Sequence, residues 1–159
     1  MVVSKFLGLD RFDSPGGVEV FLNQGDSLSV QPDWSYEGVF TFSLALGDIE
    51  GDGDLDIALA VGESYFNEPD IARVLCNTGA GDFVLCWEAD APRYSFDVAM
   101  VDINRDGAQD LIFAHQDEGH SIHLGDGQFP SKEPSWQAIS RYRQAMYALQ
   151  MCRSHRNGL

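Results

Sequence analysis

Basic residues are scarce in this sequence, and their scarcity excludes nucleic acid as a natural partner. The 159 residues include 10 lysines and arginines against 25 aspartates and glutamates, for a formal net charge of −15. A surface of that charge repels a phosphate backbone, so we expect no nucleic-acid binding. The same charge opposes compaction unless bound cations relieve the repulsion, which makes cation binding a natural role for the carboxylates.

Cysteines and long apolar runs are also scarce. Three cysteines, Cys76, Cys86 and Cys152, give no disulfide framework and no spacing typical of zinc. Cys76 and Cys86 flank a predicted hairpin but are offset across it, so we expect buried free thiols. No run of about 18 apolar residues occurs, so we expect no membrane span. The N-terminal residues also lack the apolar stretch of a secretory signal, which leaves the compartment open.

Two short acidic segments dominate what is present. Acidic loop one is residues 48–56, DIEGDGDLD, and acidic loop two is residues 102–110, DINRDGAQD. Both read D-x-(E/N)-x-D-G-x-x-D. Oxygen-bearing side chains at positions 1, 3, 5 and 9 suit Ca²⁺, which takes roughly six to eight oxygen ligands, and Gly at position 6 permits a turn that a β-carbon would obstruct. Two such loops predict a repeated unit with two Ca²⁺ sites.

Apolar residues alternate on both sides of each acidic loop. Period-2 alternation predicts strands with one strongly buried face. The alternating residues are Phe40, Phe42, Leu44 and Leu46, then Leu55, Ile57, Leu59 and Val61, around loop one, and Phe96, Val98 and Met100, then Leu111 and Phe113, around loop two. The opposite face carries residues small enough for another sheet to pack closely, namely Ala45, Ala58, Ala60, Ala99 and Ala114.

Self-comparison shows a period of about 50 residues. Residues 20–25 (VFLNQG) match residues 74–79 (VLCNTG), and residues 122–127 (IHLGDG) are a looser third copy. Residues 71–76 and 83–87 are predicted to form a hairpin over the turn at 77–82. Each unit is therefore about four antiparallel strands, which favours propeller-type blades over a sandwich. An EF-hand is excluded because strands flank the loops and position 12 is Leu59 or Phe113.

These units resemble FG-GAP/VCBS repeats, the calcium-loop blades of integrin α-subunit propellers and many bacterial surface proteins. The resemblance covers roughly residues 17–136 and rests on the two acidic loops with the Asn-x-Gly and Gly-x-Gly-x-Phe turns. It implies that site one uses the side chains of Asp48, Glu50, Asp52 and Asp56 and the carbonyl of Asp54. It implies that site two uses the side chains of Asp102, Asn104, Asp106 and Asp110 and the carbonyl of Ala108. Glu50 departs from the Asp or Asn usual at position 3.

The resemblance also implies an incomplete structure. Propellers of that family have about seven blades, whereas this chain has material for two to three, with residues 17–33 as the last hairpin of a partial blade. The predicted fold is mainly β, with two to three four-stranded antiparallel blades over residues 1–131. Residues 132–159 form a basic tail, predicted to be helical from Trp136 with Ser135 as N-cap. Open blade ends would expose apolar faces, so we expect self-association through them or a covering helix.

Catalytic patterns are absent from the sequence. His115, His120 and His123 fit no strong metal motif and are interpreted as surface or hairpin residues, and the tryptophans Trp34, Trp87 and Trp136 are expected to pack between blades. The favoured function is a non-catalytic, calcium-binding β-propeller-type module for a protein or glycan ligand, and the family suggests an extracellular or cell-surface location. Two alternatives stay open: part of a polysaccharide-active enzyme, or a truncated gene product without independent function.

Overall fold

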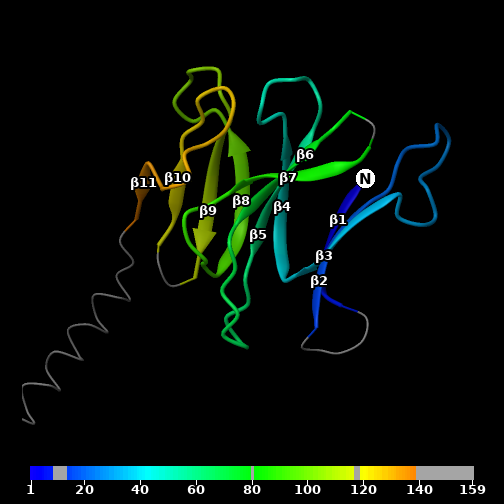
Figure 1. Cartoon of the computed structure of the whole chain (residues 1–159), viewed down its shortest axis with the longest axis horizontal. Helices are drawn as coiled ribbons and strands as arrows, with labels where there is room; N and C mark the ends of the chain where they lie inside the picture. The colour runs from blue at the N-terminus through cyan, green and yellow to red at the C-terminus, as the bar shows by residue number, and fades with distance from the viewer. Residues whose placement is uncertain (9–13, 80, 117–118, 139–159) are drawn as a thin grey trace, which may run out of the picture.

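The computed structural model describes residues 1–8, 14–79, 81–116 and 119–138, and these residues form only β-strands, turns and loops. Within them, eleven strands make three antiparallel sheets, which stand side by side with the second sheet in the middle (Figure 1). The described residues contain no helix, and hence none with the length and hydropathy needed to cross a membrane.

The first sheet has three strands, and the other two have four each. The first has the order β1-β2-β3, with β1 (Val2–Leu7), β2 (Pro15–Val20) and β3 (Trp34–Val39). The second has the order β4-β5-β6-β7, with β4 (Thr41–Gly47), β5 (Asp56–Val61), β6 (Arg73–Asn77) and β7 (Phe83–Glu88). The third has the order β11-β10-β9-β8, with β8 (Ser95–Val101), β9 (Asp110–His115), β10 (Ser121–His123) and β11 (Trp136–Gln137).

The strands that enter and leave the acidic loops lie where the alternation predicts them. β4 and β5 flank acidic loop one, β8 and β9 flank acidic loop two, and β6 and β7 form the predicted hairpin. The looser third copy of the repeat begins in β10, which pairs with β9 as β6 pairs with β5. The prediction of four-stranded antiparallel units is therefore confirmed for the second and third sheets.

The side chains of β5 point alternately toward the first sheet and toward the third sheet, and all six residues are buried. Ile57, Leu59 and Val61 pack in a cluster with valines of the first sheet. Ala58 and Ala60 pack in a second cluster with Val98, Leu111 and Phe113 of the third sheet. Because the alanines are small, the third sheet approaches the second closely, as the sequence predicts. Each fully buried large aliphatic side chain contributes about 1.5–3 kcal/mol to this packing.

Gly47, at the end of β4, lies against the third sheet. A β-carbon built on it would lie 2.3 Å from Sδ of Met100, a residue of β8. The same two strands are tied by Ser43 Oγ, which donates a hydrogen bond to Asp97 Oδ1 at 2.6 Å. These contacts fix the strands that lead into the two acidic loops relative to each other.

The outer face of the first sheet is charged. Val18 and Val20 pack toward the second sheet, so Glu19 between them faces outward. Lys5 Nζ lies 2.7 Å from Glu19 Oε1 and 3.2 Å from Glu37 Oε1, which makes a row of ion pairs across all three strands. The sequence predicts apolar faces at the open ends of the stack; on the first sheet this face also carries the three charged side chains of Lys5, Glu19 and Glu37. The prediction that residues 17–33 are the last hairpin of a partial blade is correct in part: β2 and β3 form an antiparallel hairpin, with β3 beginning at Trp34, but a strand, β1, precedes them in the same sheet.

The sheets do not close into a ring within the described residues. The helix predicted from Trp136 is wrong at its start, since Trp136 and Gln137 form β11 and pair with β10. The backbone N–H of Ser135, the predicted N-cap, donates to the carbonyl of Ile122 at 2.8 Å, which continues the antiparallel pairing. The rest of the predicted basic helix, residues 139–159, lies outside the described residues.

Candidate metal centres

The two acidic loops lie at the same end of their sheets, at the top of Figure 1. Each connects the first two strands of a four-stranded sheet, as predicted. The glycine at position 6 adopts a positive φ in both loops, 97° at Gly53 and 94° at Gly107. A residue with a β-carbon is disfavoured in that conformation, so the physical reason given for glycine at this position applies in both loops.

The aspartate at position 1 closes each loop onto its own backbone. In loop one, Asp48 Oδ1 accepts N–H groups of Gly51 at 2.8 Å and Asp52 at 3.0 Å. Its Oδ2 accepts the N–H of Gly53 at 2.9 Å. These bonds organise the loop around one carboxylate, because three successive N–H groups point at it.

Loop two repeats this closure with one bond fewer. Asp102 Oδ1 accepts the N–H of Asp106 at 3.1 Å, and Oδ2 accepts the N–H of Gly107 at 2.9 Å. The missing bond is the one from position 4, which is Gly51 in loop one and Arg105 in loop two. Arg105 has a φ of 64°, a left-handed conformation that is costly for a residue with a long side chain. The sequence shows this substitution, but its cost becomes visible only with the backbone.

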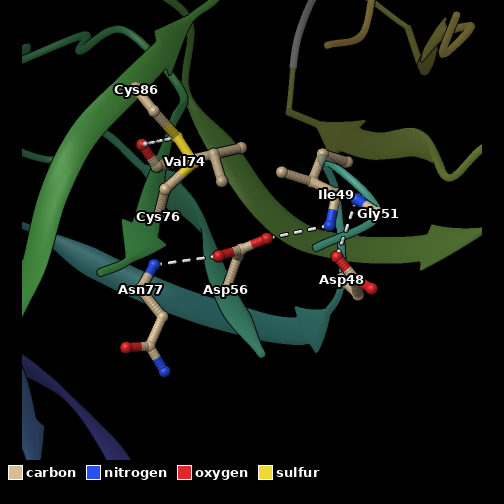
Figure 2. Close-up of a disulfide and its surroundings, with 8 residues drawn as sticks. All are labelled: Asp48, Ile49, Gly51, Asp56, Val74, Cys76, Asn77 and Cys86. Carbon is tan, nitrogen blue, oxygen red and sulfur yellow. Dashed lines mark hydrogen bonds between the residues drawn. A yellow bond between two sulfur atoms is a disulfide. The ribbon is translucent and has the colours of Figure 1, made fainter. Parts of the chain in front are cut away.

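The aspartate at position 9 of loop one is a buried anchor. Asp56 is 0% exposed. Its Oδ2 accepts the N–H of Ile49, the second residue of the loop, at 2.8 Å, and its Oδ1 accepts the N–H of Asn77, at the end of β6, at 2.9 Å. Figure 2 shows this carboxylate lying between the two N–H groups. Burial raises the pKa of Asp56, while the two N–H bonds oppose that change.

Loop two has the matching anchor. Asp110 is also 0% exposed, and its Oδ2 accepts the N–H of Ile103 at 2.9 Å. Its Oδ1 accepts the N–H of Gly125, which follows β10, at 2.8 Å. The sequence reasoning missed Asn77 and Gly125 as partners of the anchors. The aligned repeat copies at residues 74–79 and 122–127 carried the signal, since these two residues occupy the same place in them.

The residues at positions 3 and 5 are arranged differently in the two loops. Partial burial and the carboxylates of Asp56 and Asp52 raise the pKa of Glu50. In loop two, Asn104 Nδ2 donates to Asp106 Oδ2 at 2.7 Å. The N–H of Ala108 and this amide lower the pKa of Asp106. Loop one therefore carries more mutual repulsion among its carboxylates, which a cation would relieve.

The remaining predicted ligands are Asp54 and Ala108, and the backbone N–H of each donates a hydrogen bond to the aspartate at position 5 of its loop. The N–H of Asp54 donates to Asp52 Oδ1 at 2.9 Å, and the N–H of Ala108 donates to Asp106 Oδ1 at 2.9 Å. These bonds fix the residue at position 7, whose carbonyl is the predicted ligand. As arranged here, no three His, Cys, Asp or Glu side chains among the described residues converge on one point suited to a metal.

The donor set nevertheless fits a hard cation. Each loop offers only oxygen donors, and an ionised carboxylate has about four lone-pair sites. Asp56 and Asp110 each use two of them for backbone N–H groups, so each retains capacity for an ion.

The cysteine prediction is wrong. Cys76 on β6 and Cys86 on β7 form a disulfide, with Cα atoms 5.7 Å apart. The two cysteines are offset as expected, since Cys76 is paired with Val84, but Cys86 is the extra residue of a β-bulge between Leu85 and Trp87 and forms the disulfide from that position. Figure 2 shows the disulfide beside Asn77, whose N–H binds the loop-one anchor.

Two of the three histidines interpreted as surface or hairpin residues are buried, so that interpretation is wrong for them. His115 is 6% exposed and His123 is 1% exposed. The signal was the alternation itself, because His115 continues the inward series of Leu111 and Phe113 on β9. The expectation that tryptophans pack between sheets is confirmed for Trp87. It is wrong for Trp136, which is 53% exposed.

Comparison of the chain with models of known protein families gave no match, and no curated protein matches it either. The resemblance to FG-GAP/VCBS repeats therefore stays a prediction, which depends on the loops and the strands that flank them.

Proposed function

We propose that this chain is a calcium-binding, non-catalytic interaction module made of FG-GAP/VCBS-like propeller blades. The matching hydrogen bonds of the two acidic loops are the observation that carries the proposal. In each loop position 1 closes the turn, and a fully buried aspartate at position 9 connects the loop to the end of the sheet's third strand. A turn that was merely polar would not need a buried carboxylate, which is costly to desolvate.

Ca²⁺ would be held by the residues that the resemblance names. In loop one these are the side chains of Asp48, Glu50, Asp52 and Asp56 and the carbonyl of Asp54. In loop two they are the side chains of Asp102, Asn104, Asp106 and Asp110 and the carbonyl of Ala108. The ion would neutralise the clustered carboxylates and stabilise the hairpin that carries them.

The arrangement of the sheets supports blades of an incomplete propeller. The second and third sheets are four-stranded, share the same bulge near the start of β4 and of β8, and pack face to face. A binding role is favoured over catalysis because the buried histidines His115 and His123 cannot meet a substrate. The Cys76–Cys86 disulfide supports a location outside the cytosol, since disulfides persist in oxidising compartments.

Self-association through an open face is part of the proposal. The outer face of the third sheet has a shallow hollow of about 260 Å³, lined mainly by small and apolar side chains of β8 and β9, including Ala99, Ile112 and Ala114. The first sheet is less suited, because its outer face carries the ion pairs of Lys5. Light scattering should therefore give a mass above the 17.6 kDa of one chain. A monodisperse monomer at high concentration rejects this part of the proposal.

Calorimetric titration of metal-free protein tests the calcium sites directly. We expect two binding events with Ca²⁺ and weak or no binding with Mg²⁺, which demands stricter octahedral geometry. We expect EDTA to lower the melting temperature by several degrees, since a ligand that binds only the native state stabilises it by mass action. The variant Asp106→Ala should remove one binding event and leave the other.

The matched control is Asp26→Asn, which removes one exposed carboxylate outside both loops. It should keep both binding events and the full response to EDTA. No heat of binding, together with a melting curve that EDTA does not move, would reject the calcium assignment. Loss of both events in Asp106→Ala would show that the loops do not bind independently.

A further inference from the structure

A chain of four buried polar side chains crosses the inner face of the third sheet. Ser95 Oγ lies 3.0 Å from His115 Nδ1, and His115 Nε2 lies 2.8 Å from Ser121 Oγ. Ser121 Oγ lies 3.2 Å from His123 Nε2, and His123 Nδ1 lies 2.8 Å from the carbonyl oxygen of Ser131. The two serines are 0% exposed, and the histidines are 6% and 1% exposed.

The last contact determines the direction of every hydrogen bond in the chain. A carbonyl oxygen only accepts, so His123 Nδ1 carries a hydrogen, and in a neutral imidazole Nε2 then accepts from the hydroxyl of Ser121. Ser121 Oγ in turn accepts from His115 Nε2–H, which leaves His115 Nδ1 to accept from the hydroxyl of Ser95. Both imidazoles are therefore neutral, and each is fixed in one tautomer.

An added proton cannot be accommodated in this chain. On His123 it would go to Nε2, and that N–H would point at Ser121 Oγ, whose own hydrogen would lose its acceptor. On His115 it would go to Nδ1 and displace the hydroxyl hydrogen of Ser95 in the same way. Each case takes the acceptor away from a buried hydroxyl hydrogen and places a cation where the imidazoles are almost wholly removed from water.

The charged groups around the chain do not offset such a cation. Arg93, which is 8% exposed, is the main positive neighbour, and its guanidinium is paired with Asp90 at 2.8 Å. The carboxylate of Asp90 raises the pKa of both histidines and His120 lowers that of His115, but burial has the larger effect on each. Burial, together with the Arg93 charge, lowers the pKa of His115 to about 4. Burial is also the main cause that lowers the pKa of His123.

The hydrogen-bonded chain ends at residues 130–132. The carbonyl groups of these three consecutive residues each accept a hydrogen bond. The carbonyl of Pro130 accepts from Trp87 Nε1 at 2.7 Å, and that of Ser131 accepts from His123. The carbonyl of Lys132 accepts from the N–H of Asp90 at 3.0 Å. Trp87 and Asp90 belong to the second sheet and the loop after it, so residues 130–132 attach the connection between β10 and β11 to that sheet.

The second sheet has the same four-stranded pairing without a buried histidine–serine hydrogen-bond chain among its described residues. Strand pairing places Thr41, Val61 and Leu75 where the third sheet has Ser95, His115 and His123. Val61 and Leu75 are 0% exposed, and Thr41 Oγ1 is buried with no hydrogen-bond partner among the described residues. The second sheet thus buries aliphatic side chains at the positions of the two histidines, and it has Arg73 at the position of Ser121.

We propose that the chain from Ser95 to His123 is an acid-sensitive latch. At neutral pH it holds residues 130–132, the connection between β10 and β11, against the second sheet and the loop after it, and protonation of its imidazoles releases them. The sign follows from linkage: a histidine whose pKa is lower in the folded state binds fewer protons there, so the latch is intact above about pH 6.5 and opens as the pH falls toward 4. For His115 alone, a shift from 6.5 to about 4 favours opening roughly 70-fold at pH 4.5.

Hydrogen–deuterium exchange of the full chain at pH 7.0 and pH 4.5, with saturating Ca²⁺, tests the latch. After correction for the pH dependence of intrinsic exchange, the β9–β11 region should open at least tenfold more at pH 4.5 relative to β5 and β6. The second sheet is an internal control, because it has its own acidic loop but no histidine chain. The double variant His115→Val/His123→Leu introduces the residues that the second sheet has at these two positions and should abolish the relative change.

A wild type with no relative change between the two pH values would overturn the proposal. A double variant that keeps the wild-type response would overturn it as well. The single variant His115→Val guards against misfolding of the double variant, because Thr41 and Val61 already form that combination in the second sheet. It should retain native near-ultraviolet circular dichroism and lose most of the pH response, and retention of the full response would count against the latch.

Discussion

Removal of the Cys76–Cys86 disulfide should destabilise the protein by an amount that the structure allows to be worked out. The bond joins residues separated by 10 positions. In the chain-entropy model a closed loop of about that size removes roughly 9 cal/mol/K from the unfolded state, or about 2.7 kcal/mol at 25 °C. With an m-value of about 2 kcal/mol/M, the double variant Cys76→Ala/Cys86→Ala should unfold in urea at a midpoint lower by roughly 1.3 M.

Urea denaturation followed by tryptophan fluorescence measures this difference, with Cys152→Ala as the matched control. A reducing agent should shift the wild type and the control by the same amount and leave the double variant unchanged. Counting thiols with a chromogenic reagent in guanidinium gives an independent reading. Because the chain has three cysteines, one reactive thiol is expected before reduction. Three thiols before reduction, or equal midpoints for all proteins, would refute the reasoning.

The same perturbation should also reach acidic loop one. Cys76 precedes Asn77, whose N–H binds the buried anchor Asp56 at 2.9 Å, so a looser hairpin weakens one of the two bonds that place this carboxylate. In loop two the corresponding bond comes from Gly125, at the end of a strand without a disulfide. Calorimetry of the reduced protein should therefore show weaker Ca²⁺ binding at one site only. Equal weakening of both sites contradicts this coupling.

Two further substitutions test local geometry through urea denaturation. Arg105→Gly should raise the free energy of unfolding by about 0.5–1 kcal/mol, because glycine relieves the left-handed backbone that Gly51 already occupies in loop one; a loss of stability would show that the Arg105 side chain matters more. Gly47→Ala should lower it by about 1–3 kcal/mol, since its β-carbon would meet Met100. Combination with Met100→Ala should then cost less than the sum of the two changes, and strict additivity would contradict the contact.

Much of the β-architecture was predictable because period-2 alternation is a local signal. Ile57, Leu59 and Val61 mark one buried face of β5 from sequence alone, and the alanines between them mark the face that receives the third sheet. The extent of the first sheet was not predictable in this way. Its strand β1 pairs through the backbone with β2, and its side chains carry no repeat motif.

The sequence identifies the candidate metal ligands, but it does not identify the backbone groups that hold those ligands in place. Position and residue type identify Asp56 and Asp110 within the loops, whereas their backbone partners at Asn77 and Gly125 lie 21 and 15 residues further along the chain. The disulfide was missed for a related reason. Cys76 is paired with Val84, and Cys86 is the extra residue of a β-bulge from which its side chain reaches Cys76; no residue type signals that irregularity.

The ion pairs of Lys5 make the outer face of the first sheet less suited to docking of a further sheet than the outer face of the third sheet. A further sheet that docked there would have to strip water from Lys5, Glu19 and Glu37, and desolvation of charged groups is expensive unless new partners replace the water. At the opposite end, the hollow over β8 and β9 is mainly apolar, with Ile112 and Ala114 in its lining, and its carboxylate, Asp97, already accepts a hydrogen bond from Ser43, so contact there desolvates fewer charged groups. Tandem fusions of this unit should consequently be extended from the side of the third sheet, with the first sheet left as the terminus.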